Sequence, residues 1–441
     1  MPLSTAVGSP RNNAPVTESS APQDSQPAQE AKSARVRPWG SLRHAQFRLL
    51  VGSGLLSAMG MQMREVINYW VVFDLTGSFL QLGILGSLRI LPLVVIGLLG
   101  GVLADIIDRR KILMFGYGGS FLTTGVLAVL SLTGNLESIW PVYATTLLSS
   151  TVTVLDGPAR TGLIYDSVPR SHLTNALTLA SSSHQSSILI GPAVGGLLIS
   201  FFSGEVGPAY VVTTAMYVPA MAAVLLLSDV RPAEGRSRPR LRRADLLEGL
   251  RWVGRTPIVL ALTSIDFTAM VFTGYKVLLP FYAVKLGVGA SGFGFLTSAP
   301  AVGFLIGSAV LLALGDVPRK GLVMAVGIVG YVGAVFVFAV SPWFAVSLVA
   351  LAAAGGFDGV SAIMRRTTLQ LLVPDDIRGR ATAVIQVFTR STSSVGLMAT
   401  GGIASLPILG PAGALLAGGV FALGALAATT LRWRQILTFR I

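Results

Sequence analysis

Long apolar runs separated by short polar segments occupy most of this chain. Twelve of them are long enough to cross a bilayer as a helix, which takes about 20 apolar residues. They lie at roughly 47–72, 79–103, 112–133, 139–161, 176–201, 208–228, 257–282, 291–314, 321–340, 344–366, 381–404 and 408–430. The runs are continuous and lack the alternation typical of outer-membrane β-barrel strands. This pattern predicts an all-α membrane protein with twelve transmembrane helices.

Basic residues fall on one side of this layout, and the opposite loops carry essentially only Lys285. The basic positions are Arg43, Arg48, Arg109 to Lys111, Arg236 to Arg243, Arg319, Lys320, Arg378, Arg380, Arg432 and Arg434. Loops rich in Lys and Arg stay in the cytoplasm, so both termini are predicted to be cytoplasmic. The net charge of +13 is thus explained by topology, and we expect no nucleic-acid partner.

The polar segments divide the chain into five parts. Residues 1–45 are rich in Ser, Ala, Pro and Gln, which predicts a disordered cytoplasmic tail. Two six-helix bundles are predicted at 46–228 and 257–431, and a short cytoplasmic tail at 432–441. The linker at 229–256 contains RADLLEGLRWV, whose apolar spacing predicts an amphipathic helix on the inner membrane surface.

An internal repeat supports this division into two bundles. The fourth run ends in LDGPARTGLIYDSVPR and the tenth in FDGVSAIMRRTTLQLLVPDDIRGR, so an Asp-Gly pair precedes Val-Pro by a similar interval in both. The matches fall at equivalent helices of the two halves. Duplicated six-helix halves with a substrate site near the midplane are a known transporter design.

Composition agrees with a membrane protein and narrows the chemistry. Only 12% of residues are charged and 52% are hydrophobic, with a mean hydropathy of +0.70. The chain has no cysteine and three histidines, none in a metal-ligand spacing. No Ser/His, paired-acid or metal constellation is present at a workable spacing. We therefore expect no enzymatic activity, no metal and no cofactor.

Two motifs resemble those of the major facilitator superfamily. GGVLADIIDRRK, after the second run, resembles motif A, and SILIGPAVGG, in the fifth, resembles motif C of the antiporter branches. The first resemblance implies a cytoplasmic latch between the halves, and the second favours export. The residues concerned are Gly101, Asp105, Arg109 and Arg110 in the latch motif, and Gly191, Pro192, Gly195 and Gly196 in the motif of the fifth run.

Further segments narrow the resemblance within the superfamily. LTGSFLQLGILGSLRILP, LDGPARTGLIYDSVP and VPDDIRGRA look like the drug and siderophore exporter branch, which includes the enterobactin and macrolide exporters. The matches run from the first helix to the eleventh. They imply a bacterial cytoplasmic membrane protein that moves small molecules, which we expect to be a monomer.

Four acids lie within spans, where ionisable groups are costly and usually line an aqueous path. They are Glu65, Asp156, Asp266 and Asp358, in the first, fourth, seventh and tenth runs. In the superfamily these four helices surround the central cavity. Asp266, near the middle of its span, is the first candidate for a proton or cation site, and Glu65 is the second. Asp156 and Arg160, four apart on one helix face, are interpreted as a structural pair.

Buried bases leave a second interpretation open. Arg89, Arg390 or Lys276, as well as Arg64, would neutralise Asp266 or Glu65 in structural ion pairs. A site of mixed charge suits amphiphilic, zwitterionic or anionic ligands at least as well as cations. His184 is either a proton relay or a packed neutral side chain.

These features predict a proton-coupled exporter of small amphiphilic molecules, drugs or siderophores, that works by alternating access. The proton gradient would be its energy source. An uptake symporter or a lipid flippase of the same fold is the main alternative. A membrane sensor that binds a ligand without transporting it is another.

Overall fold

The computed structural model describes residues 39–96, 108–227, 243–315, 319–374 and 377–432. Every regular element within these ranges is an α-helix or a short 3-10 helix. The all-α prediction is therefore confirmed for the part of the chain that the structure describes.

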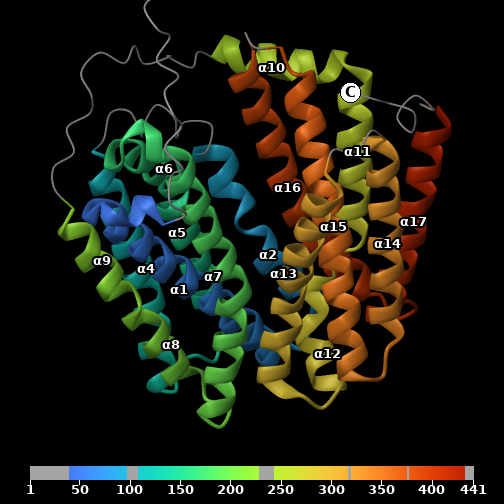
Figure 1. Cartoon of the computed structure of the whole chain (residues 1–441). Coiled ribbons are helices and arrows are strands. Elements are labelled where there is room, and N and C mark those ends of the chain that lie inside the picture. The colour runs from blue at the N-terminus through green and yellow to red at the C-terminus, as the bar shows by residue number, and fades with distance from the viewer. Residues whose placement is uncertain (1–38, 97–107, 228–242, 316–318, 375–376, 433–441) are drawn as a thin grey trace, which may run out of the picture. The chain divides into compact units, whose positions relative to one another are not determined.

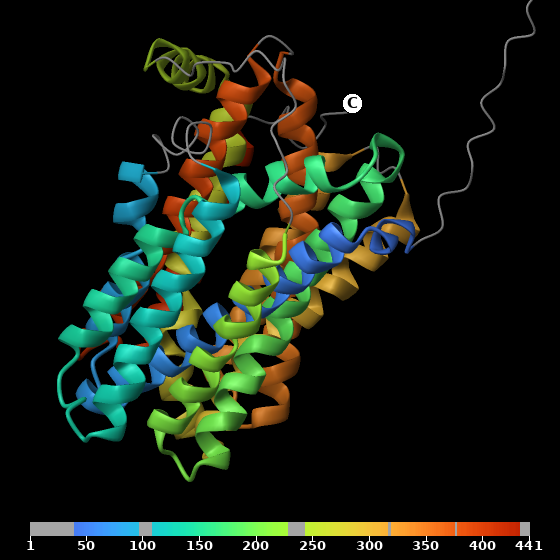
Figure 2. The ribbon, with the colours of Figure 1, turned by 90° about the vertical axis from the view of Figure 1, so that its left-hand side faces the viewer.

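The first half of the bundle is drawn from blue to green in Figure 1. Its elements are η1 (Gly40–Arg43), α1 (Ala45–Thr76), α2 (Phe79–Ser87), α4 (Arg109–Leu132), α5 (Trp140–Thr153), α6 (Asp156–Ser167), η2 (Arg170–His172), α7 (Leu173–Phe201), α8 (Val206–Ala215) and α9 (Tyr217–Leu225). Figure 2 turns this half toward the viewer and shows α1, in blue, running diagonally past its neighbours. The most extensive contact of α1 is with α7.

The second half is drawn from yellow to red in Figure 1. Its elements are α10 (Arg243–Arg255), α11 (Pro257–Phe272), η3 (Tyr275–Leu278), α12 (Leu279–Lys285), α13 (Gly289–Leu314), α14 (Lys320–Val340), α15 (Phe344–Leu372), α16 (Arg378–Ala404) and α17 (Gly410–Arg432). The helix predicted from RADLLEGLRWV is α10, which packs against α16 and α11.

Nine helical segments in the described ranges are long and apolar enough to cross a membrane, and they match nine of the twelve predicted runs. The other three runs, 47–72, 139–161 and 381–404, are helical as α1, α5 with α6, and α16. These three are more polar: α1 carries Arg64 and Glu65 at mid-length, and α16 is rich in Ser and Thr. Polar side chains inside a span are expected where a helix faces protein or water instead of lipid.

Several predicted runs are interrupted helices. The fourth run breaks between α5 and α6, the sixth between α8 and α9, and the second at Leu88 and Arg89. The seventh breaks at Thr273 and Gly274, where the hydroxyl of Tyr331 donates to the carbonyl of Thr273 at 3.2 Å. Such breaks are tolerated inside a membrane when neighbouring side chains satisfy the freed backbone groups. A hydropathy profile does not reveal these helix breaks, because the residues on both sides of each break are apolar.

The two halves meet along two seams, α7 against α13 and α2 against α16. A Cβ at Gly294 of α13 would lie 3.0 Å from Cα of Gly196 in α7, and a Cβ at Gly401 of α16 would lie 3.1 Å from Cα of Gly83 in α2. Both seams therefore depend on glycine, because only a missing side chain lets the backbones approach this closely. Gly196 and Gly401 lie toward the C-terminal ends of α7 and α16, Gly294 lies near the N-terminal end of α13, and Gly83 lies in the middle of α2. This is the end of the bundle opposite α10.

Candidate functional site

An ion pair joins the middle of α1 to the break that follows α2. Nη1 of Arg89 donates to Oε2 of Glu65 at 2.8 Å. The side chain of Arg89 is 36% exposed and that of Glu65 28% exposed, so the pair borders an accessible space. An ion pair lowers the cost of placing either charge within a membrane span. Of the alternatives left open by the sequence, the structure supports pairing of Glu65 with Arg89.

Two further cations lie near this pair. Glu65 is close enough to interact electrostatically with Arg64 and Lys276 as well as with Arg89. Arg64 is only 5% exposed and donates to Oγ1 of Thr123 in α4 at 3.3 Å. Lys276 belongs to η3 in the second half, and its side chain is exposed. The structure thus brings three predicted site residues together, Glu65, Arg89 and Lys276, from both halves of the chain.

The other predicted site residues do not join this cluster in the described part of the structure. The side chains of Asp266 in α11 and Arg390 in α16 lie outside the described residues. Asp358 is half-buried in α15, close enough to interact electrostatically with Tyr275. His184 is exposed along α7. The roles predicted for these four residues stay predictions.

Asp156 and Arg160, predicted as a structural pair, interact electrostatically but are not one of the two direct ion pairs found among the described residues. Nη2 of Arg160 donates to the hydroxyl of Tyr117 at 2.5 Å, and Nη1 donates to the carbonyl of Leu50 at 3.5 Å. Oδ1 of Asp156 lies against Gly116 of α4 and is buried with no hydrogen-bond partner among the described residues. Asp156 lies against Gly116 of α4, whereas the guanidinium of Arg160 bonds to Tyr117 of the same helix and to Leu50 of α1. Spacing along a helix does not fix these directions.

The latch motif is described only in part, because Gly101 and Asp105 lie outside the described residues. Nη1 of Arg109, the first residue of α4, lies 2.6 Å from Oδ2 of Asp166 near the end of α6. Arg110 donates from Nε to the carbonyl of Val224 at 3.0 Å and from Nη2 to that of Leu225. The two arginines therefore tie the start of α4 to the ends of α6 and α9.

Sequence reasoning missed Asp166 as a partner of Arg109. The two residues are 57 positions apart. The available signal was an acid shortly after the fourth run, on the side where the basic loops gather.

The motif of the fifth run lies at two helix contacts. All four of its residues, Gly191, Pro192, Gly195 and Gly196, are buried in α7. A Cβ at Gly195 would lie 3.1 Å from Cα of Met63 in α1, and one at Gly196 would lie 2.8 Å from Cα of Gly294 in α13. The motif therefore lets α7 pack closely on α1 within its own half and on α13 across the seam.

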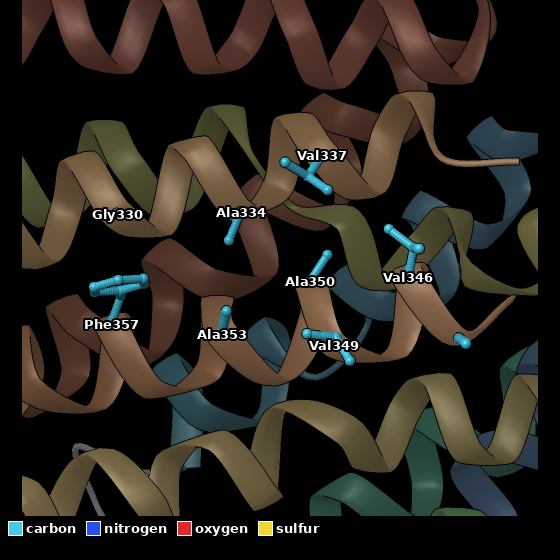
Figure 3. Close-up of a pocket in the computed structure, with 9 residues that line it drawn as sticks. Gly330, Ala334, Val337, Val346, Val349, Ala350, Ala353 and Phe357 are labelled. Atoms are coloured by element: carbon cyan, nitrogen blue, oxygen red, sulfur yellow. The ribbon is translucent and has the colours of Figure 1, made fainter. Parts of the chain in front are cut away.

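A second accessible feature is an apolar groove between α14 and α15, with a volume of about 510 Å³ (Figure 3). Its lining has no charged side chain and includes Val349, which is 70% exposed, and Phe357. Figure 3 shows these side chains along the two facing helices. A groove of this composition suits an acyl chain and has no groups for proton exchange.

Comparison with known proteins identifies the family. The family model described as "Transmembrane secretion effector" matches residues 36–437. The chain belongs to this family. The chain resembles the enterobactin exporter EntS of Salmonella choleraesuis strain SC-B67, with 24% identity over 82% of this chain and 86% of that protein. It also resembles the uncharacterized MFS-type transporter YfiS of Bacillus subtilis strain 168, with 26% identity over 79% of this chain and 86% of that protein.

Solved structures place this family member in the major facilitator fold. A bacterial homolog of the human lysosomal transporter Spinster, inward-facing and unoccupied, matches with a TM-score of 0.69 and 16% identity over 90% of this chain and 98% of that one. The nucleoside transporter NupG also matches with a TM-score of 0.69, at 13% identity over 88% and 99%. The protein is therefore a multi-pass membrane transporter of the major facilitator type. Since proteins of this kind are not enzymes, the expectation of no enzymatic activity is confirmed.

Proposed function

We propose that this transporter exports small amphiphilic molecules, drugs or siderophores, across the bacterial cytoplasmic membrane in exchange for protons. Similarity to an enterobactin exporter supports the direction and the substrate class. The position of the motif of the fifth run at the seam between α7 and α13 supports alternating access, since it lies where the halves must separate. Both termini are cytoplasmic in this proposal, as the basic loops predict.

The observation that carries the proposal is the accessible ion pair of Glu65 and Arg89 between two predicted spans, with Lys276 of the other half nearby. Charged groups that stay accessible within spans mark substrate or ion pathways. Residues from both halves surround the same space, as alternating access between two halves requires. The glycine seams lie at the end away from α10. With cytoplasmic termini, this end is extracellular, so the two seams close the extracellular side.

The transport cycle follows from this arrangement. Substrate enters from the cytoplasm, the latch side closes, and the seams at Gly196 with Gly294 and Gly83 with Gly401 separate. A proton from outside binds an acid of the central site as the substrate leaves, and the return of the halves releases it to the cytoplasm. Asp266 is the first candidate for this acid and Glu65 the second.

Reconstitution into proteoliposomes tests the coupling. Efflux of enterobactin or erythromycin, measured with and without a proton gradient, should depend on the gradient. Asp266→Asn should abolish the response to pH, whereas Asp74→Asn, near the outer end of α1, should keep it. Efflux that is equally fast without a gradient contradicts proton coupling. An unchanged pH response in Asp266→Asn excludes this residue.

A lipid flippase of the same fold is the second candidate, favoured by the apolar groove between α14 and α15. Dithionite quenching of fluorescent phospholipids in proteoliposomes tests it. Translocation of labelled lipid above that of empty vesicles, together with absence of drug or siderophore efflux, supports this alternative.

A further inference from the structure

Among the side chains that the structure describes, the charges around the accessible ion pair do not balance. Glu65 is close enough to interact with three cations, Arg64, Arg89 and Lys276. Within this cluster Arg89 uses the carboxylate of Glu65 in a direct hydrogen bond. One carboxylate therefore lies within electrostatic range of three cationic side chains.

Lys276 is the cation of this cluster that is best placed to meet a ligand. Within η3 the side chains of Tyr275, Val277 and Leu278 are buried, and that of Lys276 is exposed. Lys276 belongs to neither of the two ion pairs found among the described residues. Since η3 contacts α2 of the first half as well as α16, Lys276 stands at the junction of the halves.

Arg64 has a different place in the cluster. It is buried and donates to the neutral hydroxyl of Thr123, away from the accessible space. It cannot reach a ligand directly, but its charge adds to the positive potential at Glu65. In a medium of low dielectric constant, this potential is screened much less than in water.

An excess of cations within a membrane protein is unfavourable unless an anion compensates it. We propose that Lys276 binds an acidic group of the substrate, such as a carboxylate or a phenolate, so that the site selects acidic amphiphiles over neutral and basic ones. This inference rests on the proposed export function and specifies its substrate class. Arg89 and Arg64 support this binding because their charges raise the positive potential around Glu65.

The assignment has a consequence for proton exchange. A proton on Glu65 would release Arg89 and strengthen the attraction for an anion, whereas exchange requires that proton binding oppose substrate binding. Glu65 is therefore the partner that holds Arg89 in place.

Three probes with one ring system and different charge test the inference. These are 2-naphthoate, 2-naphthamide and 2-naphthylmethylammonium, titrated calorimetrically into the purified full-length transporter at pH 7.5. The wild type should bind the acid about tenfold more tightly than the amide, as one additional ionic contact provides. The ammonium compound should bind most weakly.

Matched lysine variants assign the effect to one position. Lys276→Gln should bind the acid and the amide equally, and Lys276→Arg should retain the preference for the acid. Lys285→Gln serves as control, because Lys285 ends α12 with its ammonium 5.4 Å from the ring centroid of Tyr282. Thermal unfolding of each variant verifies that it is folded.

Three outcomes would overturn the inference: equal binding of acid and amide by the wild type, a preference for the acid that survives in Lys276→Gln, or no binding of any probe. The binding assay is independent of transport direction and coupling. A protein that binds acids through Lys276 but does not export would contradict the proposed function and leave this inference intact.

Discussion

Nη1 of Arg89 lies 2.8 Å from Oε2 of Glu65 and links a break in the second span to the middle of the first. The two residues are 24 positions apart, and both side chains remain partly exposed. The contact connects two helices of the first half beside the place where Lys276 of the second half approaches.

This pair predicts unequal effects of single and double substitutions. Arg89→Gln leaves the carboxylate of Glu65 without its partner and should lower the free energy of unfolding by about 1–3 kcal/mol. The double variant Glu65→Gln with Arg89→Gln should lose less, because no unpaired charge remains. Thermal unfolding of the four proteins in one detergent measures the coupling. Additive effects of the two substitutions would show that the pair contributes nothing.

Sequence patterns predicted the helices better than the contacts among their side chains. Hydropathy located every described span, because the requirement for apolar surface acts on each helix separately. The pairing of Glu65 with Arg89, instead of Arg64, depends on helix rotation and on the break at Leu88 and Arg89. The contacts of Arg160 have the same origin, since its guanidinium bonds to Tyr117 and Leu50, which spacing along its own helix could not predict.

The seam at Gly294 predicts a conformational effect of a larger side chain. A Cβ at this position would lie 2.6 Å from the carbonyl oxygen of Pro192, so Gly294→Leu should destabilise the closed seam by about 1–3 kcal/mol. The chain has no cysteine, so Ala290→Cys, at a position 6% exposed beside Gly196, provides a single reporter. Its labelling by an impermeant maleimide should rise in Gly294→Leu.

A matched control exists for this substitution. A Cβ at Gly333 of α14 would have no heavy atom within 4 Å, so Gly333→Leu should label like the parent. Equal labelling in all three proteins would show that the glycine seam does not control closure of this end.

A crosslink across the same seam should arrest transport. The amide of Ser291 in α13 donates to Oγ of Ser200 in α7 at 3.0 Å. Ser200→Cys combined with Ser291→Cys should form a disulfide under mild oxidation that stops transport, and reduction should restore it. Full transport by the oxidised protein would mean that α7 and α13 need not separate.

The contact between Arg109 and Asp166 predicts a rescue by charge exchange. The two side chains are 30% and 13% exposed, so Asp166→Asn should reduce stability by about 1 kcal/mol and slow transport. Arg109→Asp combined with Asp166→Arg should recover part of both. Transport rates of the single and exchanged variants, measured at equal protein content, test this. If the exchanged variant is no more stable and transports no faster than the worse single variant, the attraction between the two charges is not what the protein requires at these positions.

The central claim is that this family member exports its substrate, and transport direction tests it most directly. Enterobactin and erythromycin should accumulate in inverted membrane vesicles that contain the wild-type protein and an acidic lumen. The accumulation should exceed that of vesicles without the protein and should be lost when a protonophore is added. Accumulation confined to right-side-out vesicles, which corresponds to uptake, would contradict the account.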